Sequence, residues 1–125
     1  MKEIPKISES EWQVMRVLWS KSPATANRIV QALSKKTRWK PKTVKTLINR
    51  LVQKKAIDFE KKGREYLYFP VAAQADCVKA ESRNFMQRVY GGSLRPMLAA
   101  FIEEENLSTE DVKELKKILA NKGGK

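Results

Sequence analysis

A chain of 125 residues is long enough for one domain with a modest core, or for a small domain that carries an appendage. Its 26 Lys and Arg outnumber its 14 Asp and Glu, and the formal net charge of +12 favours a polyanionic partner, nucleic acid first and an acidic membrane surface second. Because histidine is absent and Cys77 is the only cysteine, the sequence excludes Ser-His and Cys-His nucleophile pairs, histidine-based zinc sites and an internal disulfide, and we expect neither an enzyme nor a bound cofactor.

The first two helices are marked by their capping residues. Ser8, with Glu11 three residues later, forms a capping box that predicts a helix beginning at Glu9. Thr25 is a plausible N-cap for a second helix that ends near Lys36. In the first helix one apolar stripe is expected to lie in the core, and its members are Trp12, Met15, Leu18 and Trp19. The alternative for the two tryptophans is stacking on nucleic-acid bases.

A third helix is predicted within residues 40–55, KPKTVKTLINRLVQKK, which contain six Lys and Arg and no acid. Pro41 suits its first turn because proline has no amide hydrogen to leave unpaired. One side of this helix is apolar, and the other carries the predicted DNA-binding residues Lys42, Thr43, Lys45, Thr46, Asn49 and Arg50. A helix face without acids lacks the favourable pairs of acidic and basic side chains that stabilise most exposed helices. The residue types on this face can also form hydrogen bonds with phosphates and base edges. The alternative is a basic face that is merely solvated.

A β-hairpin is predicted for residues 56–71, AIDFEKKGREYLYFPV, with Gly63 in its turn. We place Lys61, Lys62 and Arg64 in the turn, at an exposed tip, and predict that they too bind DNA, along a phosphate backbone or minor groove. A hairpin that only closes the core is the alternative. Three helices with a basic third member, followed by a hairpin, is the element order of a winged helix-turn-helix domain, whose recognition helix enters the major groove.

Three amphipathic helices are predicted in residues 73–125. The first ends at the Gly91-Gly92 pair, and the last begins after Ser108, which forms a capping box with Asp111. Their apolar stripes are too extensive for so small a body to bury within itself, so we predict a homodimer. The predicted dimerisation residues are Val78, Phe85, Val89, Leu94, Leu98, Phe101, Ile102, Val112, Leu115, Ile118 and Leu119. A monomer in which these helices pack back on the first domain is the alternative.

The distribution of charge separates the same two halves. Residues 1–72 contain 17 Lys and Arg against 6 Asp and Glu, whereas residues 73–125 contain 9 against 8. We therefore predict a mainly α-helical protein with a small β-hairpin, in which residues 1–72 form a winged-helix DNA-binding domain and residues 73–125 a three-helix dimerisation domain. A two-fold dimer would present two recognition helices to a palindromic site. Cys77 is expected to be a small core or interface residue.

No segment indicates export or a membrane span. The longest apolar stretches fall far short of the roughly 18 consecutive residues that a membrane span needs. The N-terminal sequence MKEIPKISES lacks the apolar core of a signal peptide. We therefore expect a cytoplasmic protein without direct membrane association.

Three segments, ISESEWQVMRVLW, WKPKTVKTLINRLVQKKAI and VYGGSLRPMLAAFIEEENLSTEDVKELKKIL, resemble the penicillinase repressor family, which includes the methicillin-resistance repressors. The resemblance covers nearly the whole chain, and the W-x-P-K-T-x-x-T-L-x-x-R-L core followed by L-S-x-E-[DE] makes it specific. It implies a dimeric bacterial repressor on palindromic operators upstream of β-lactamase or related resistance genes. By position, the family's DNA-contacting segment falls on Lys42, Thr43, Lys45, Thr46 and Arg50.

The resemblance also implies a route of induction. In this family a membrane-bound β-lactam sensor with a cytoplasmic protease domain triggers cleavage of the repressor within its dimerisation region. The matching position is Ala100-Phe101, whereas the better-known members of the family have a sequence like Asn-Phe at that position. Cleavage there would remove the following helix from the interface, and the loss of the dimer would lower DNA affinity. Copper-responsive relatives carry clustered cysteines, and a lone cysteine without histidine gives no support for metal sensing.

Functions of other classes remain as alternatives. A weakly sequence-dependent architectural DNA-binding protein and an RNA or ribosome binder both fit a basic winged domain. A regulatory enzyme would rest only on the acidic run Glu103 to Glu105, which we interpret as a solvated turn between helices.

Overall fold

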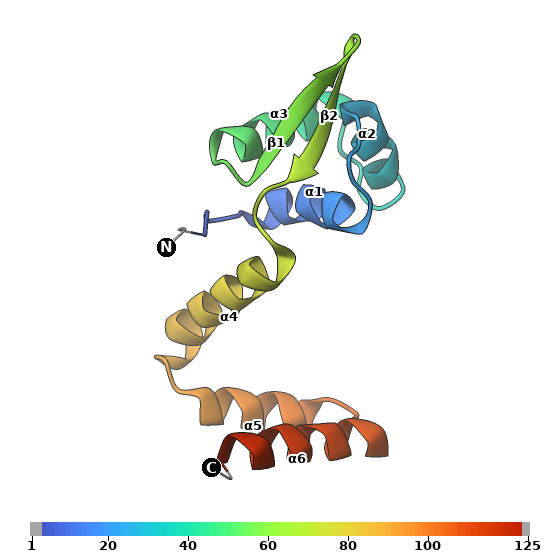
Figure 1. Cartoon of the computed structure of the whole chain (residues 1–125). Coiled ribbons are helices and arrows are strands. Elements are labelled where there is room, and N and C mark those ends of the chain that lie inside the picture. Colours follow the sequence, from blue (N-terminus) through green and yellow to red (C-terminus); the bar gives the residue numbers. More distant parts are fainter. Residues whose placement is uncertain (1–3, 124–125) are drawn as a thin grey trace. The chain divides into compact units, whose positions relative to one another are not determined.

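The computed structural model describes residues 4–123, which contain six helices and one two-stranded sheet (Figure 1). The chain divides into two compact units, Met1–Glu81 and Ser82–Lys125. The predicted functional division between residues 72 and 73 lies slightly earlier in the chain, and its outermost positions, 1–3 and 124–125, fall outside the described residues. In chain order the elements are α1 (Glu9–Ser20), α2 (Ala26–Ser34), α3 (Pro41–Gln53), β1 (Ile57–Lys62), β2 (Glu65–Pro70), α4 (Gln74–Tyr90), α5 (Leu94–Glu104) and α6 (Thr109–Gly123).

The helices of the first unit begin where their capping residues place them. The Ser8 hydroxyl accepts a hydrogen bond from the Glu11 backbone N–H at 3.2 Å, and the Glu11 carboxylate accepts one from the Ser8 N–H at 2.9 Å. Thr25 accepts a hydrogen bond from the backbone N–H of Arg28 at 3.2 Å at the start of α2. Pro41 occupies the first turn of α3. Each of these caps satisfies or removes an amide that the helix itself leaves unpaired.

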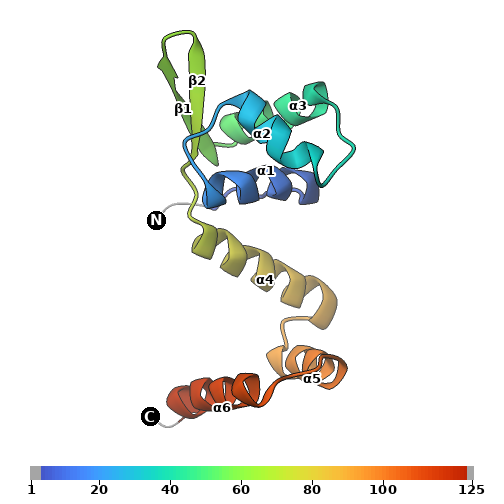
Figure 2. The ribbon, with the colours of Figure 1, turned by 90° about the vertical axis from the view of Figure 1, so that its right-hand side faces the viewer.

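The hairpin closes through a tight turn at Gly63 and Arg64. Its strands are antiparallel and remain paired up to Lys62 and Glu65. Gly63 has a φ of +65°, a conformation that glycine adopts without steric cost. Lys61 and Lys62, which we expected in the turn, are instead the last residues of β1 because strand pairing continues through them. In Figures 1 and 2 the turn projects away from α1.

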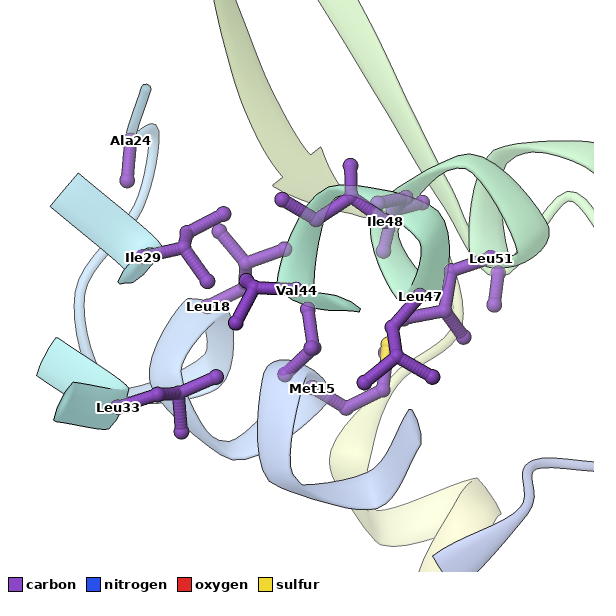
Figure 3. Close-up of a cluster of buried hydrophobic side chains, with 12 residues drawn as sticks. Met15, Leu18, Ala24, Ile29, Leu33, Val44, Leu47, Ile48 and Leu51 are labelled. Carbon is purple, nitrogen blue, oxygen red and sulfur yellow. The ribbon is translucent and has the colours of Figure 1, made fainter. Parts of the chain in front are cut away.

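The core of the first unit lies between its three helices and the base of the hairpin, and α1, α2 and α3 pack pairwise (Figure 3). A backbone bridge between Ala24 and Tyr68 fastens β2 to the loop before α2. The fully or nearly fully buried members of this core are Val14, Met15, Leu18, Ala24, Ile29, Leu33, Val44, Leu47, Ile48, Leu51, Ala56 and Ile57. All of them are apolar, so the hydrophobic effect supplies the main stabilisation of this unit.

Both tryptophans of α1 contribute to packing, which favours the core interpretation over base stacking. Trp12 and Trp19 are partly buried against the core and meet edge to face, with ring centroids 5.1 Å apart. The indole N–H of Trp19 donates to the carbonyl of Ala72 at 3.0 Å. Cys77, at the start of α4, is buried as expected, and this burial, with the nearby Asp76 carboxylate, raises the pKa of its thiol.

The second unit consists of helices with little buried surface. Gly91 and Gly92, both with positive φ, end α4, and Ser93 is the N-cap of α5, although its side chain makes no capping hydrogen bond. The capping box predicted for α6 is present, because Ser108 and Asp111 exchange two hydrogen bonds at 3.0 and 3.3 Å. In contrast to the first unit, neither α5 nor α6 contains a buried residue in its described part.

Within residues 4–123, no helix combines the length and the apolar composition that crossing a membrane requires.

Candidate nucleic-acid interface

The outer face of α3 is polar and exposed, while its inner face is closed by the core. Val44, Leu47, Ile48 and Leu51 on the inner face are at most 4% exposed. All six residues that the sequence placed on the opposite face are exposed, namely Lys42, Thr43, Lys45, Thr46, Asn49 and Arg50. The amphipathic projection of this helix therefore holds, and its polar face is accessible to a partner.

The positive charges of this face are not neutralised within the described chain. Among residues 4–123 the one salt bridge joins Lys54 to Glu11, so Lys42, Lys45 and Arg50 have no acidic partner. Cations without acids among them create a positive local potential, which attracts an anionic partner and repels the charges from one another in its absence. A duplex phosphate backbone would relieve that repulsion.

Thr46 has a more restricted bonding capacity than its sequence alone indicated. Its hydroxyl donates to the backbone carbonyl of Lys42 one turn earlier, at 3.0 Å. The hydroxyl proton is therefore used inside the helix. What Thr46 can offer a base is its methyl group, which suits the thymine methyl, and its remaining lone pairs, which can accept only from a donor such as the amino group of adenine or cytosine.

The outer face of α3 continues onto the hairpin around a small hollow of about 190 Å³. Lys45 of α3, Asn27 at the start of α2 and Tyr66 of β2 all line this hollow, and Tyr66 is 45% exposed. The sequence did not single out Asn27 or Tyr66. The alternation in the hairpin indicated only a strand, and no local pattern shows that three separate elements meet at one surface.

The tip of the hairpin presents its cations to solvent on a stiff support. Lys61, Lys62 and Arg64 are all exposed. Below them, the ring of Phe59 lies 4.9 Å from that of Tyr66 and 5.7 Å from that of Tyr68, between centroids. Such cross-strand aromatic contacts stabilise a two-stranded ribbon that would be marginal alone.

The C-terminal end of α3 is held by a Schellman closure. The N–H of Ala56 donates to the carbonyl of Leu51, and the N–H of Lys55 donates to that of Val52, both at 3.0 Å. Lys55 itself has a φ of +65°, a left-handed conformation that this closure requires and that glycine usually supplies. A lysine in this conformation carries backbone strain, and it places a further cation near the C-terminal end of α3.

Lys54 and Glu11 form a contact that the sequence did not indicate. The Lys54 ammonium lies 2.5 Å from the Glu11 carboxylate, whose residue is 2% exposed, and it also donates to the carbonyl of Lys6 at 2.8 Å. Burial alone would raise the pKa of Glu11, but hydrogen bonds from Lys54 and from the Ser8 backbone outweigh it, so this pKa lies below its ordinary value. We had counted Lys54 among the cations of the third helix region, whereas its charge is directed inside the unit. Glu11 and Lys54 are 43 residues apart, which explains why no local pattern revealed them.

The helices of residues 73–125 carry many exposed apolar side chains. Of the eleven predicted dimerisation residues, Phe85 and Leu98 are half-buried, and the Phe85 ring lies 6.2 Å from that of Phe101. The other nine are between 36% and 61% exposed, and they are Val78, Val89, Leu94, Phe101, Ile102, Val112, Leu115, Ile118 and Leu119. Exposed apolar residues that recur along several helices are typical of a protein–protein interface.

The candidate cleavage position lies inside a helix. Ala100 is half-buried and Phe101 is 46% exposed, and both belong to α5. The peptide bond that joins them is followed by the end of α5 and all of α6.

A family model described as Penicillinase repressor matches residues 7–121. The chain belongs to the penicillinase repressor family. This membership agrees with the resemblance of the three quoted segments, and it confirms the expectation of a transcriptional repressor rather than an enzyme.

Individual members of the penicillinase repressor family match over almost their full length. The penicillinase repressor of Bacillus licheniformis is 40% identical over 119 residues, which cover 95% of this chain and 93% of that protein. The methicillin resistance regulatory protein MecI of Staphylococcus aureus strain N315 is 37% identical over 117 residues, covering 94% and 95%. The solution structure of monomeric Bacillus licheniformis BlaI in complex with the blaP half-operator is 41% identical, with a TM-score of 0.54 over 61% of this chain and 93% of that one. This similarity confirms the predicted winged helix-turn-helix fold.

Proposed function

We propose that this protein is a homodimeric repressor that binds a palindromic operator and controls genes of the β-lactamase or penicillinase type. The observation that carries the proposal is the exposed, acid-free face of α3 in a protein 41% identical to BlaI, which has been solved on the blaP half-operator. The names of its relatives, penicillinase repressor and methicillin resistance regulatory protein, support this class of target gene.

In the proposed complex, α3 lies in the major groove. Its N-terminal residues Lys42, Thr43 and Thr46 reach base edges, whereas the longer side chains toward its ends also reach phosphates. The hairpin tip then follows a neighbouring backbone and adds affinity that depends on salt more than on sequence. Lys45 and Tyr66, which line one hollow, form the junction between these two contacts.

The exposed apolar residues of the helices in residues 73–125 support homodimerisation. A single DNA-binding unit contacts one half-site, and linking two of them makes binding to the second half-site an intramolecular step. A two-fold axis through the dimer then matches the two-fold axis of a palindrome. The alternative is a monomer in which these helices pack back on the first domain, and sedimentation of the wild type distinguishes it from the dimer.

We also propose induction by proteolysis at Ala100-Phe101, and membership of the family supports this proposal. Cleavage after Ala100 would separate α6 from the rest of the chain. This helix carries Val112, Leu115, Ile118 and Leu119. Phe101 and Ile102 also lie beyond the cut, so the released fragment carries six of the eleven proposed interface residues. We therefore expect both the dimer and its operator affinity to be lost. Ala100 stands where the better-known members of the family have a residue like asparagine. We therefore expect the sensor protease of this system to accept a small residue before the cut.

The DNA-binding test compares a palindromic duplex built from the blaP half-operator with a scrambled duplex of equal length and composition. Lys42→Ala should lose roughly 1 to 3 kcal/mol of binding free energy on the palindrome and much less on the scrambled duplex. Lys62→Ala should weaken binding to both alike and reduce the salt slope by about one. Lys113→Ala on α6 is the control, because Lys113 is an exposed cation outside the proposed DNA surface. This variant should bind both duplexes with wild-type affinity.

Three outcomes distinguish the functional classes. Equal wild-type affinity for both duplexes at every salt concentration would indicate an architectural DNA-binding protein. Tighter binding to structured RNA than to either duplex would indicate an RNA binder. Equal losses on both duplexes for Lys42→Ala and Thr46→Ala would contradict the assignment of α3 as the recognition helix.

A further inference from the structure

The Glu11–Lys54 pair joins the N-terminal part of the described chain to the end of α3, which lies 43 residues later in the sequence. The Glu11 carboxylate accepts the Ser8 N–H at the start of α1 and the Lys54 ammonium at the end of α3. The same ammonium donates to the carbonyl of Lys6 in the segment that precedes α1. The ammonium group of Lys54, the C-cap of α3, thus ties the end of α3 to the first turn of α1 and to the segment before it.

We propose that the Glu11–Lys54 pair is a positioning device that sets the axial placement and tilt of the recognition helix, and that it thereby controls operator specificity without contacting DNA. The inference rests on the proposed function, because it concerns the helix that reads the operator. Neither residue is among the proposed DNA contacts.

The location of the pair suits this role. Lys54 is the C-cap of α3, and its own backbone N–H donates to Arg50. The outer face begins at Lys42 and ends at Arg50, so a shift of the C-terminal end changes the angle at which the whole face meets the groove. Base contacts need bidentate geometry and tolerate such a change poorly, whereas phosphate contacts by long side chains adapt to it.

The unequal burial of the two side chains means that the Glu11 carboxylate holds Lys54 in place. Glu11 is 2% exposed and Lys54 is 36% exposed, so the lysine is free to reach water but the glutamate is not. An isolated buried carboxylate is costly, and it therefore holds the lysine in place. The Schellman closure at Lys55 and Ala56 fixes the backbone that follows, which leaves the end of α3 anchored on both sides.

The alternative role for Lys54 is a phosphate contact like the other cations of this region. Glu11→Gln distinguishes the two roles, because it keeps an acceptor for the Ser8 N–H but releases the Lys54 charge. A phosphate-contacting lysine that is released should bind DNA as tightly as before or more tightly. A positioning lysine that is released should weaken binding to the operator.

The experiment measures dissociation constants for the full-length chain on the palindromic blaP-derived duplex and on its scrambled counterpart, over a range of salt concentrations. Glu11→Gln and Lys54→Met should each lower affinity for the palindrome by about tenfold, equivalent to the loss of one good base contact, and leave the scrambled duplex nearly unchanged. The salt slope should stay at its wild-type value because no phosphate contact is removed. Lys54→Arg, which keeps the charge, should restore most of the palindrome affinity.

Lys55→Gln is the matched control. It removes the same charge from the adjacent, exposed position. The ratio of palindrome to scrambled affinity should remain that of the wild type in this variant, whatever happens to the absolute affinities. The Glu11→Gln/Lys54→Met double variant should lose no more than either single variant, because the two residues act as one pair.

A reduced salt slope with equal losses on both duplexes for Lys54→Met would overturn the proposal, as would an unchanged affinity ratio in Glu11→Gln. Should the wild type itself fail to distinguish the duplexes, the proposed operator binding fails. Hydrogen exchange then decides about the pair separately. The amides of Lys55 and Ala56 should exchange faster in Glu11→Gln and Lys54→Met than in the wild type, and wild-type exchange in both variants would exclude an anchored helix end.

Discussion

The two units of this protein distribute apolar and charged side chains in opposite ways. In the first, the apolar residues of α1, α2 and α3 are buried and the outer face of α3 is charged. In the second, α5 and α6 bury no residue in their described parts, and large apolar side chains remain exposed. A unit with its own core can fold alone, whereas a unit that exposes its apolar stripe needs a partner surface to be stable. We propose that this difference separates DNA recognition in the first unit from assembly in the second.

The largest expected effect is a truncation within the first core. Leu51→Ala removes a side chain that is fully buried between the helices, and it should lower the free energy of unfolding by about 2 to 5 kcal/mol. Leu119→Ala removes the same atoms from a residue that is 61% exposed, so it should cost less than about 1 kcal/mol in the monomer. Urea unfolding at low protein concentration measures both. Equal losses would contradict the contrast between the units.

A charge placed in the exposed stripe tests whether a second copy covers it. Leu115→Asp should convert the dimer to monomers in sedimentation experiments, because an unpaired carboxylate would be buried at the interface. Asn121→Asp, which adds the same charge at an exposed polar position of α6, should remain dimeric. The wild-type melting temperature should rise with protein concentration, and that dependence should disappear in Leu115→Asp. A persistent dimer in Leu115→Asp would place the interface elsewhere.

The end of α3 allows a smaller test within the first unit. Lys55→Gly should stabilise the protein by about 0.5 to 1 kcal/mol, because glycine relieves the strain of a φ of +65° and this gain exceeds its entropic cost. Gln53→Gly, two residues earlier and still inside the helix, should instead cost about 0.5 to 1 kcal/mol. Thermal unfolding of the three proteins measures the difference. A destabilised Lys55→Gly variant would mean that the lysine side chain contributes contacts that outweigh its strain.

The fold was accessible from the sequence because its signals are local. The capping boxes at Ser8 and Ser108, the proline at the start of α3 and Gly63 in the hairpin each act within a few residues, and each lies where it was predicted. The outer face of α3 followed from helical periodicity alone. The convergence of Asn27, Lys45 and Tyr66 and the Glu11–Lys54 pair were not accessible, because they depend on how separate elements pack and no spacing in a single sequence encodes that.

The smallest expected effect is on the stability of the first unit at acid pH. This measurement tests the contribution of the Glu11 charge alone. Because the pKa of Glu11 in the folded state lies below its ordinary value, its stabilising contribution is present above the unfolded-state pKa and is lost as the pH falls through the folded-state pKa. Glu11→Gln has no such titration, so its free energy of unfolding should fall less steeply with acid than that of the wild type, and the two curves should converge at low pH. Glu9→Gln, which removes an exposed carboxylate from the same first turn, is the matched control for the change in net charge. If Glu11→Gln kept the full acid dependence, the pair with Lys54 would contribute nothing through its charge, and α3 would be held by its packing and its Schellman closure alone.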